Sequence, residues 1–163
     1  MAKIRQSQPL VPSVLDRLMD DEPEVTRETA KSRTQVLREL RLCVQRDLEN
    51  LLNTRWRCDS WPAGLPELEH SLVNYGIPDF SGASVSSSND RQRLRRIIER
   101  AIELFEPRFQ SFRVEMVDNE DPSDRTIRFR IDAMLFAHPA PEPVVFDSQL
   151  ESTSQQFEVR QAR

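Results

Sequence analysis

The spacing of the apolar residues changes from helical to strand-like at Pro107. Before this proline, apolar residues recur every three or four positions, and after it they alternate with polar residues. Proline has no backbone N–H, and it disfavours helical dihedral angles in the residue before it. The sequence therefore predicts that Glu106 leaves a helix, that Pro107 turns the chain and that Arg108 enters a strand. A carboxylate and a guanidinium are then held close together at a stiff junction.

Two long amphipathic helices are predicted before this junction. The first should run from about Ser32 to Asn53, with a capping box between Ser32 and Gln35. The second should begin near Asn89, where Gln92 is available for a capping exchange. The residues expected to face the core are Val36, Leu37, Leu40, Cys43, Val44, Leu48, Leu51 and Leu52 in the first helix, and Leu94, Ile97, Ile98, Ala101, Ile102 and Phe105 in the second.

Strand-like alternation follows Pro107 in several segments. Phe112, Val114 and Met116 mark the first strand, a second should cover 127–135, and a third should cover 144–151. The third strand is expected to continue, with a bend, through Phe157 and Val159. The pattern predicts an α+β domain in which two long helices pack on a small, mainly antiparallel sheet of three to four strands.

The expected organisation is an N-terminal arm followed by a single domain. Residues 1–31 should form the arm, with a short docking helix around 13–19, and residues 32–163 should form the α+β domain. The short helix either docks on the body of this chain or binds a partner through its apolar face. Between the two long helices, 54–88 is predicted to be loop-rich, with Gly76 in a turn that favours a positive φ.

Composition argues against several classes of function. The net charge of −4 disfavours general nucleic-acid binding, which favours basic surfaces. The two cysteines, Cys43 and Cys58, have neither Cys-x-x-Cys spacing nor neighbouring histidines, so a reduced cytoplasmic protein without a zinc site is expected. No apolar run approaches the roughly 18 residues of a membrane helix, so direct membrane insertion is not expected.

No catalytic constellation is found in the sequence. There is no glycine-rich phosphate loop, paired-histidine metal motif or Gly-x-Ser-x-Gly elbow, and His70 and His138 lie far apart. Glu106 could be nominated as a general acid, but the neighbouring Arg108 would lower its pKa, which is the wrong direction. No catalytic, metal-binding or cofactor-binding residue is therefore predicted, and no cofactor is expected.

Binding features remain after this search. The Glu106–Arg108 pair is either an internal salt bridge that braces the junction or a charged contact with a partner. A small sheet also has edges that can accept a strand from another chain. Five arginines between Arg91 and Arg100 either form a solvated helix face or meet an acidic partner surface.

A family resemblance is carried by short motifs that occur in order along nearly the whole chain. The chain resembles the TssE family, baseplate wedge subunits of type VI secretion systems, and its relatives in contractile phage tails, which are often labelled lysozyme-like. The motifs are Ser13–Leu18, Asp47–Arg55, Leu72–Asp79, Glu106–Arg108, Phe129–Ile131 and Pro143–Asp147.

The resemblance implies a structural, non-catalytic protein that connects the baseplate wedge to the contractile sheath and templates sheath assembly. It implies that Glu106, Pro107 and Arg108 form the sheath-docking motif, and that sheet edges receive strands from sheath subunits. The implied partners are wedge subunits similar to TssF, TssG and TssK and sheath subunits similar to TssB and TssC, in the cytoplasm at a membrane-anchored apparatus. The alternatives are a muramidase-like peptidoglycan hydrolase and a regulatory adaptor on the same fold.

Overall fold

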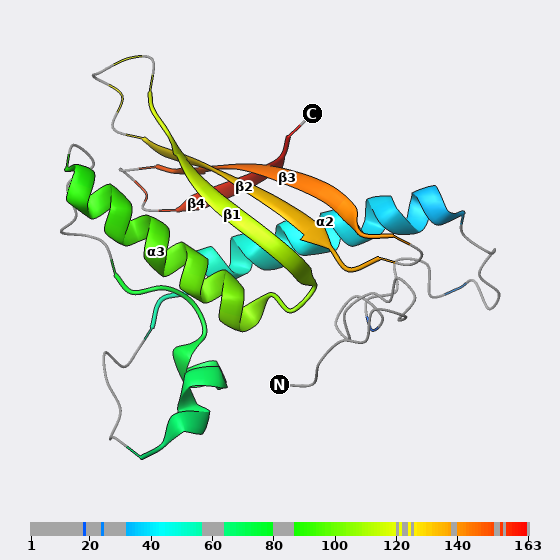
Figure 1. Ribbon diagram of the computed structural model, residues 1–163, viewed down its shortest axis with the longest axis horizontal. Helices are drawn as coiled ribbons and strands as arrows, with labels where there is room; N and C mark the ends of the chain where they lie inside the picture. The colour runs from blue at the N-terminus through cyan, green and yellow to red at the C-terminus, as the bar shows by residue number, and fades with distance from the viewer. Residues whose placement is uncertain are drawn as a thin grey trace.

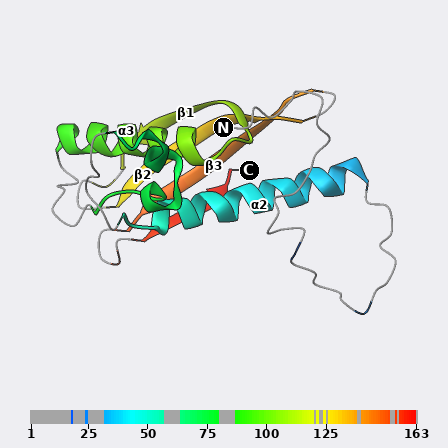
Figure 2. The same cartoon turned by 90° about the horizontal axis from the view of Figure 1, so that it is seen from below.

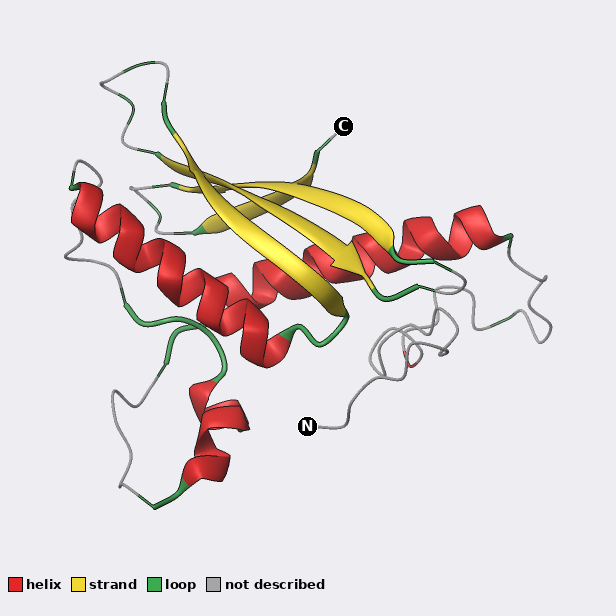
Figure 3. Ribbon diagram, viewed as in Figure 1, coloured by secondary structure: helices red, strands yellow, loops and turns green. Residues whose placement is uncertain are grey.

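Two helices and four strands form the body of the protein (Figures 1 and 3). The computed structural model describes residues 18, 24, 32–56, 64–79, 87–119, 121, 124, 126–137, 140–151, 154 and 156–162. The elements in chain order are α2 (Arg33–Asn53), the 3₁₀ turns η1 (Pro66–His70) and η2 (Leu72–Asn74), α3 (Ser88–Phe105), β1 (Phe109–Val117), β2 (Ile127–Leu135), β3 (Glu142–Leu150) and β4 (Phe157–Gln161). Apart from Leu18, the predicted docking helix of the arm lies outside the described residues.

The strands form one antiparallel sheet in the order β1-β2-β3-β4. Both helices cover the same face of this sheet, with α3 against β1 and α2 against β4 (Figures 1 and 2). The inward-facing residues of the sheet follow the pairing register: Val114 lies opposite Ile131, and Ile131 lies opposite Phe146. The α+β class and the antiparallel sheet predicted from the sequence are confirmed.

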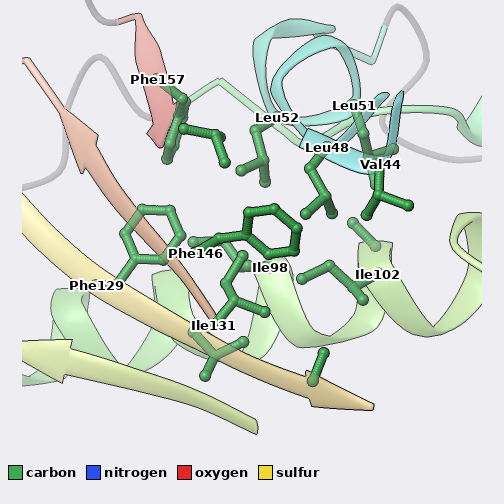
Figure 4. Packing of buried hydrophobic residues seen from close by; sticks show 14 of the residues in the cluster. Val44, Leu48, Leu51, Leu52, Ile98, Ile102, Phe129, Ile131, Phe146 and Phe157 are labelled. Carbon is green, nitrogen blue, oxygen red and sulfur yellow. The ribbon is translucent and has the colours of Figure 1, made fainter. Parts of the chain in front are cut away.

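The core lies between the two helices and the inner face of the sheet (Figure 4). Phe129 and Phe157 make an edge-to-face contact, with ring centroids 5.9 Å apart. Leu48 and Leu52 of α2 and Ile98 of α3 are fully buried in the same cluster. Burial of each such side chain stabilises the fold by about 1.5–3 kcal/mol, so this cluster holds the helices on the sheet.

The starts of the two helices test the capping predictions. Ser32 and Gln35 form the predicted capping box, because the amide of Gln35 donates to Ser32 Oγ (3.3 Å) and the amide of Ser32 donates to Gln35 Oε1 (2.8 Å). The predicted start of α3 near Asn89 agrees with the observed start at Ser88, but the predicted capping exchange with Gln92 was wrong. Ser87 is the N-cap, and its hydroxyl accepts from the amide of Asp90. A run of three serines offered several capping hydroxyls, so the sequence did not single out one.

The end of the sheet also differs from the prediction. Phe157 and Val159 do not continue β3 through a bend; they belong to a separate strand, β4, that runs antiparallel to it. The chain reverses after Leu150, and the amide of Glu151 donates to the carbonyl of Gln156 (3.1 Å). Apolar alternation is the same on both sides of a reversal, so this pattern did not distinguish a bend from a hairpin.

Gly76 ties the loop region to the end of α2. Its φ is +109°, as predicted from the turn signal. The carbonyl of Gly76 accepts from Trp56 Nε1 (2.8 Å), and the next residue, Ile77, is fully buried and donates its amide to Thr54 O (2.9 Å). A Cβ on residue 76 would lie only 2.3 Å from Thr54 O. Only glycine therefore allows this close approach of two backbone segments.

We expect Gly76→Ala to destabilise the protein more than Gly64→Ala does. Both glycines have a positive φ, but a Cβ on Gly64 would meet nothing within 4 Å. Backbone strain should cost about 1–3 kcal/mol in each variant, and the clash with Thr54 should cost a further ~1–3 kcal/mol at Gly76. Chemical denaturation of both variants measures the difference, and equal losses would contradict the proposed close approach.

Candidate functional site

The Glu106-Pro107-Arg108 junction lies where α3 ends and the sheet begins. Glu106 is the C-cap of α3, and its amide donates to the carbonyl of Ile102 (2.9 Å). Its dihedral angles are non-helical, as expected for a residue that precedes proline. Arg108 precedes β1 by one residue, and its carbonyl already accepts from the amide of Phe136 (2.9 Å). The predicted helix end and chain turn are therefore confirmed.

Glu106 and Arg108 form a bidentate salt bridge inside the protein. Arg108 Nε donates to Glu106 Oε1 (2.6 Å), and Arg108 Nη2 donates to Glu106 Oε2 (2.5 Å). The amide of Arg108 also donates to Glu106 Oε1 (3.2 Å). Only 5% of Glu106 is exposed, whereas Pro107 is exposed to solvent. The sequence left open whether this pair is an internal salt bridge or a contact with a partner. The structure contains the internal salt bridge.

Asp47 of α2 is the third member of this cluster, and the sequence analysis missed it. Arg108 Nη2 donates to Asp47 Oδ2 (2.7 Å) across a separation of 61 residues in the chain. Asp47 lies three residues after Val44 and four before Leu51, both buried in the apolar stripe of α2. A carboxylate at this spacing within an apolar stripe was the available signal. Through Arg108, the cluster joins α2 to the α3–β1 junction.

The cluster keeps its central guanidinium charged. Burial by itself lowers the pKa of Arg108, but the hydrogen bonds and charges of Glu106 and Asp47 raise it by more, so the pKa lies above its ordinary value. Arg108 Nη1 is buried and has no hydrogen-bond partner. A buried charge that loses its partner is strongly destabilising, so each member depends on the others.

Tyr75 is affected by the same cluster. Burial raises the pKa of its phenol, the negative charges of Asp47 and Glu106 raise it further, and the positive charge of Arg108 lowers it. Its ring makes an edge-to-face contact with Phe105, the last residue of α3, with centroids 5.3 Å apart. The pKa of Tyr75 therefore depends on the charges at the junction.

The residues that the sequence offered for catalysis lie in different places in the structure. Both oxygens of Glu106, the residue nominated as a general acid, accept hydrogen bonds from Arg108. His70 is exposed at the end of η1, as expected for a helix-end residue, while His138 lies outside the described residues. Over the part of the chain that the structure describes, no group of three His, Cys, Asp or Glu side chains could hold a metal ion. In the same part, no helix is long and apolar enough to span a membrane.

The sheet presents two edges. β1 pairs only with β2 and β4 pairs only with β3 among the described strands. The outer face carries ion pairs such as Arg130–Asp147 (2.8 Å) and Arg113–Glu115 (2.9 Å). Charged side chains next to an edge discourage indiscriminate strand pairing. The edges are thus available to an incoming strand of suitable sequence.

The arginines of α3 divide into two groups. Arg91 pairs with Asp118 (2.8 Å), Arg95 pairs with Glu99 (3.9 Å), and Arg100 pairs with Glu103 (2.7 Å) and with Glu69 of η1. Arg93 and Arg96 are exposed and have no ionic partner among the described residues. Three of the five arginines therefore form ion pairs within the chain. The other two are exposed charges that a partner could contact.

Comparison with known proteins gives one family. A family model described as baseplate wedge protein gp25 matches residues 38–140, a span that contains Asp47 and the Glu106–Arg108 junction. A chain in a solved structure titled "The baseplate complex from the type VI secretion system" has a similar fold, with a TM-score of 0.51 and 18% sequence identity. The match covers 77% of this chain and 96% of that chain. No curated protein matches this sequence.

We expect Arg108→Ala to destabilise the protein by about 3–5 kcal/mol, because it leaves the buried carboxylate of Glu106 unpaired. Asp47→Ala should lower the free energy of unfolding by less, about 1.5–3 kcal/mol, because Arg108 still forms its salt bridge with Glu106. Arg113→Ala is the control, since its side chain is 75% exposed and its ion pair should contribute under about 1 kcal/mol. Chemical denaturation measures all three variants.

A double-mutant cycle tests whether the cluster acts as one unit. The double variant of Asp47 and Arg108 should be more stable than the sum of the single losses predicts, by about 0.5–3 kcal/mol. Additive losses would show that the contact between Asp47 and Arg108 contributes no coupling.

Tyr75, the single tyrosine of the chain, should titrate above the ordinary tyrosine pKa of about 10. The folded state favours the neutral phenol, so this stabilisation is present below the unfolded pKa and is lost as pH rises through the folded pKa. Asp47→Asn should lower the pKa of Tyr75, and Asp147→Asn on the outer face should not change it. Tyrosinate absorbance measures the titration, and an unchanged pKa in Asp47→Asn would contradict the coupling.

Proposed function

We propose that this chain, which belongs to the baseplate wedge protein gp25 family, is a baseplate component of a type VI secretion apparatus that connects the baseplate wedge to the contractile sheath and templates sheath assembly. The observation that carries the proposal is the braced junction at the start of β1. Glu106, Pro107 and Arg108 form the proposed sheath-docking motif, and the edge strand β1 begins directly after it.

The three residues of the motif have different parts in this proposal. Pro107 is exposed and contacts the sheath subunit directly. Glu106 and Arg108 act from inside, because their salt bridge and the contact with Asp47 hold the angle at which β1 leaves α3. A sheath strand that adds to a sheet edge gains main-chain hydrogen bonds, and side chains on that strand supply specificity. A rigid edge lowers the entropic cost of this docking.

Assembly in a ring multiplies weak contacts. In the proposal, several copies of the junction are presented together by the other wedge subunits, which are similar to TssF, TssG and TssK. Sheath subunits similar to TssB and TssC dock on this ring, in the cytoplasm at a membrane-anchored apparatus. Linked weak contacts give a stable assembly that can still rearrange when the sheath contracts.

The alternative functions receive no support from the site. The muramidase-like alternative needs one carboxylic acid with a raised pKa and a second carboxylate at a set distance. Glu106, the acid nominated from the sequence, is bound through both oxygens by Arg108. No described feature favours the regulatory adaptor over a structural subunit.

We expect Pro107→Glu to abolish sheath assembly while the protein folds and joins the baseplate. Pro107 is exposed, so the substitution places a charge at the docking surface without removing the brace. The measurement is the number of fluorescent sheath structures per cell, with the level and baseplate recruitment of the variant followed in parallel. Pro66→Glu is a control of the same chemistry, because Pro66 is exposed at the start of η1.

Arg108→Ala should also reduce sheath assembly, by loosening β1. The number of sheaths should fall by more than the cellular level of the variant falls. If Arg108 only stabilised the fold, the number of sheaths would fall in proportion to that level. Normal sheath numbers in both Pro107→Glu and Arg108→Ala would rule out the docking role.

A further inference from the structure

An open cleft of about 270 Å³ lies between α3 and the segment that carries η1 and η2. Figure 1 shows this segment beside the C-terminal part of α3, away from the sheet edges. The apolar lining comes from Trp56 on one side and from Ile97, Ala101, Leu104 and Phe105 of α3 on the other. Glu69, Arg96 and Arg100 also line the cleft. The cleft is separate from the Glu106–Arg108–Asp47 cluster.

The side of α3 that lines the cleft has a regular pattern. Ile97, Ala101 and Leu104 are spaced by four and three residues, so they lie along one stripe of the helix. Arg93, Arg96 and Arg100 run beside this stripe with spacings of three and four. Ala101 and Leu104 are buried and Ile97 is half-buried, so the three arginines are the exposed groups of α3 beside the cleft.

The charges beside the cleft favour an acidic occupant. Arg93 and Arg96 are exposed and have no ionic partner among the described residues, although the whole chain has a net charge of −4. Arg100 pairs with Glu69 across the mouth of the cleft. Both side chains of this pair are exposed, and exposed ion pairs are weak, so an incoming carboxylate can replace Glu69 at Arg100.

Two exposed apolar residues lie next in sequence to a residue that lines the cleft. Leu72 is 88% exposed and Val73 is 46% exposed, and both precede the lining residue Asn74 in η2. The cleft itself is smaller than the roughly 300–1,000 Å³ pockets of drug-sized ligands. It has room for a bulky side chain, and only a longer ligand would also cover η2. A polypeptide segment fits this shape better than a small molecule does.

From these observations we propose that the cleft binds an acidic amphipathic segment of another polypeptide. One or two bulky apolar side chains of that segment enter between Trp56 and Ile97, and its carboxylates pair with Arg96 and Arg93. This surface is distinct from the sheet edge, so the inference does not depend on sheath docking.

Photo-cross-linking in the full chain tests the proposal. The photoreactive residue p-benzoylphenylalanine is placed at Val73, beside the cleft, and at Leu42, which is 52% exposed on α2, as the control position. Expression in native cells followed by mass spectrometry should identify a cross-linked peptide from another polypeptide at Val73. That peptide should contain a bulky apolar residue next to Asp or Glu, and the Leu42 position should not capture it.

Charge reversal supplies the matched control. Arg96→Glu should lower the Val73 cross-link about tenfold or more, because a like charge at an interface costs several kcal/mol and each 1.4 kcal/mol is a factor of ten. Arg38→Glu makes the same charge change on an exposed arginine of α2 and should leave the cross-link unchanged. Both substitutions are on the surface, so melting curves should confirm that the variants fold.

Three outcomes would overturn the proposal: no cross-link at Val73, a cross-link to residues 1–31 of the same chain, or a cross-link that Arg96→Glu does not weaken. A partner that belongs to the baseplate would support both this inference and the proposed function. A partner from outside the baseplate would support the cleft and count against the proposed function. Sheath assembly and cleft binding can therefore fail independently.

Discussion

Arg108 joins two carboxylates that come from different parts of the chain, and the relative placement of helices and sheet depends on this contact. Its guanidinium holds both oxygens of the buried Glu106 and one oxygen of Asp47. Burying charges is costly unless each is paired and hydrogen-bonded, so this arrangement tolerates little movement of α2 against the start of β1. The apolar core holds the helices on the sheet, and the ion cluster restricts the angle at which they meet it.

This restriction leaves two different surfaces available. The helices cover one face of the sheet, and no described element covers its charged outer face or pairs with its two edges. The cleft beside α3 lies on another part of the molecule, bordered by Arg96 and Arg100. In the two proposals, a sheet edge pairs with a strand and the cleft binds an acidic segment, so one subunit would contact two partners at once. Such a division suits a component that links one assembly to another.

The main elements could be predicted because they follow from local chemistry. The capping box at Ser32, the helix end before Pro107 and the positive φ of Gly76 each depend on residues close together in the sequence. The family resemblance located the junction and is supported by the family match. The wrong predictions also concerned local features of the sequence. Three adjacent serines offered equivalent caps for α3, and alternating apolar residues did not reveal the reversal between β3 and β4.

The sequence by itself determined the order of helices and strands, the apolar face of each, and the presence of opposite charges on either side of Pro107. Only the tertiary structure decided what those charges contact. Asp47 reaches Arg108 across 61 residues because α2 packs beside the α3–β1 junction, and no local pattern encodes that distance. The cleft has the same origin, since Trp56 and Ile97 meet only when the loop region folds against α3. The spacing of apolar side chains predicts helices and strands, whereas the contacts between them depend on how they pack around the core.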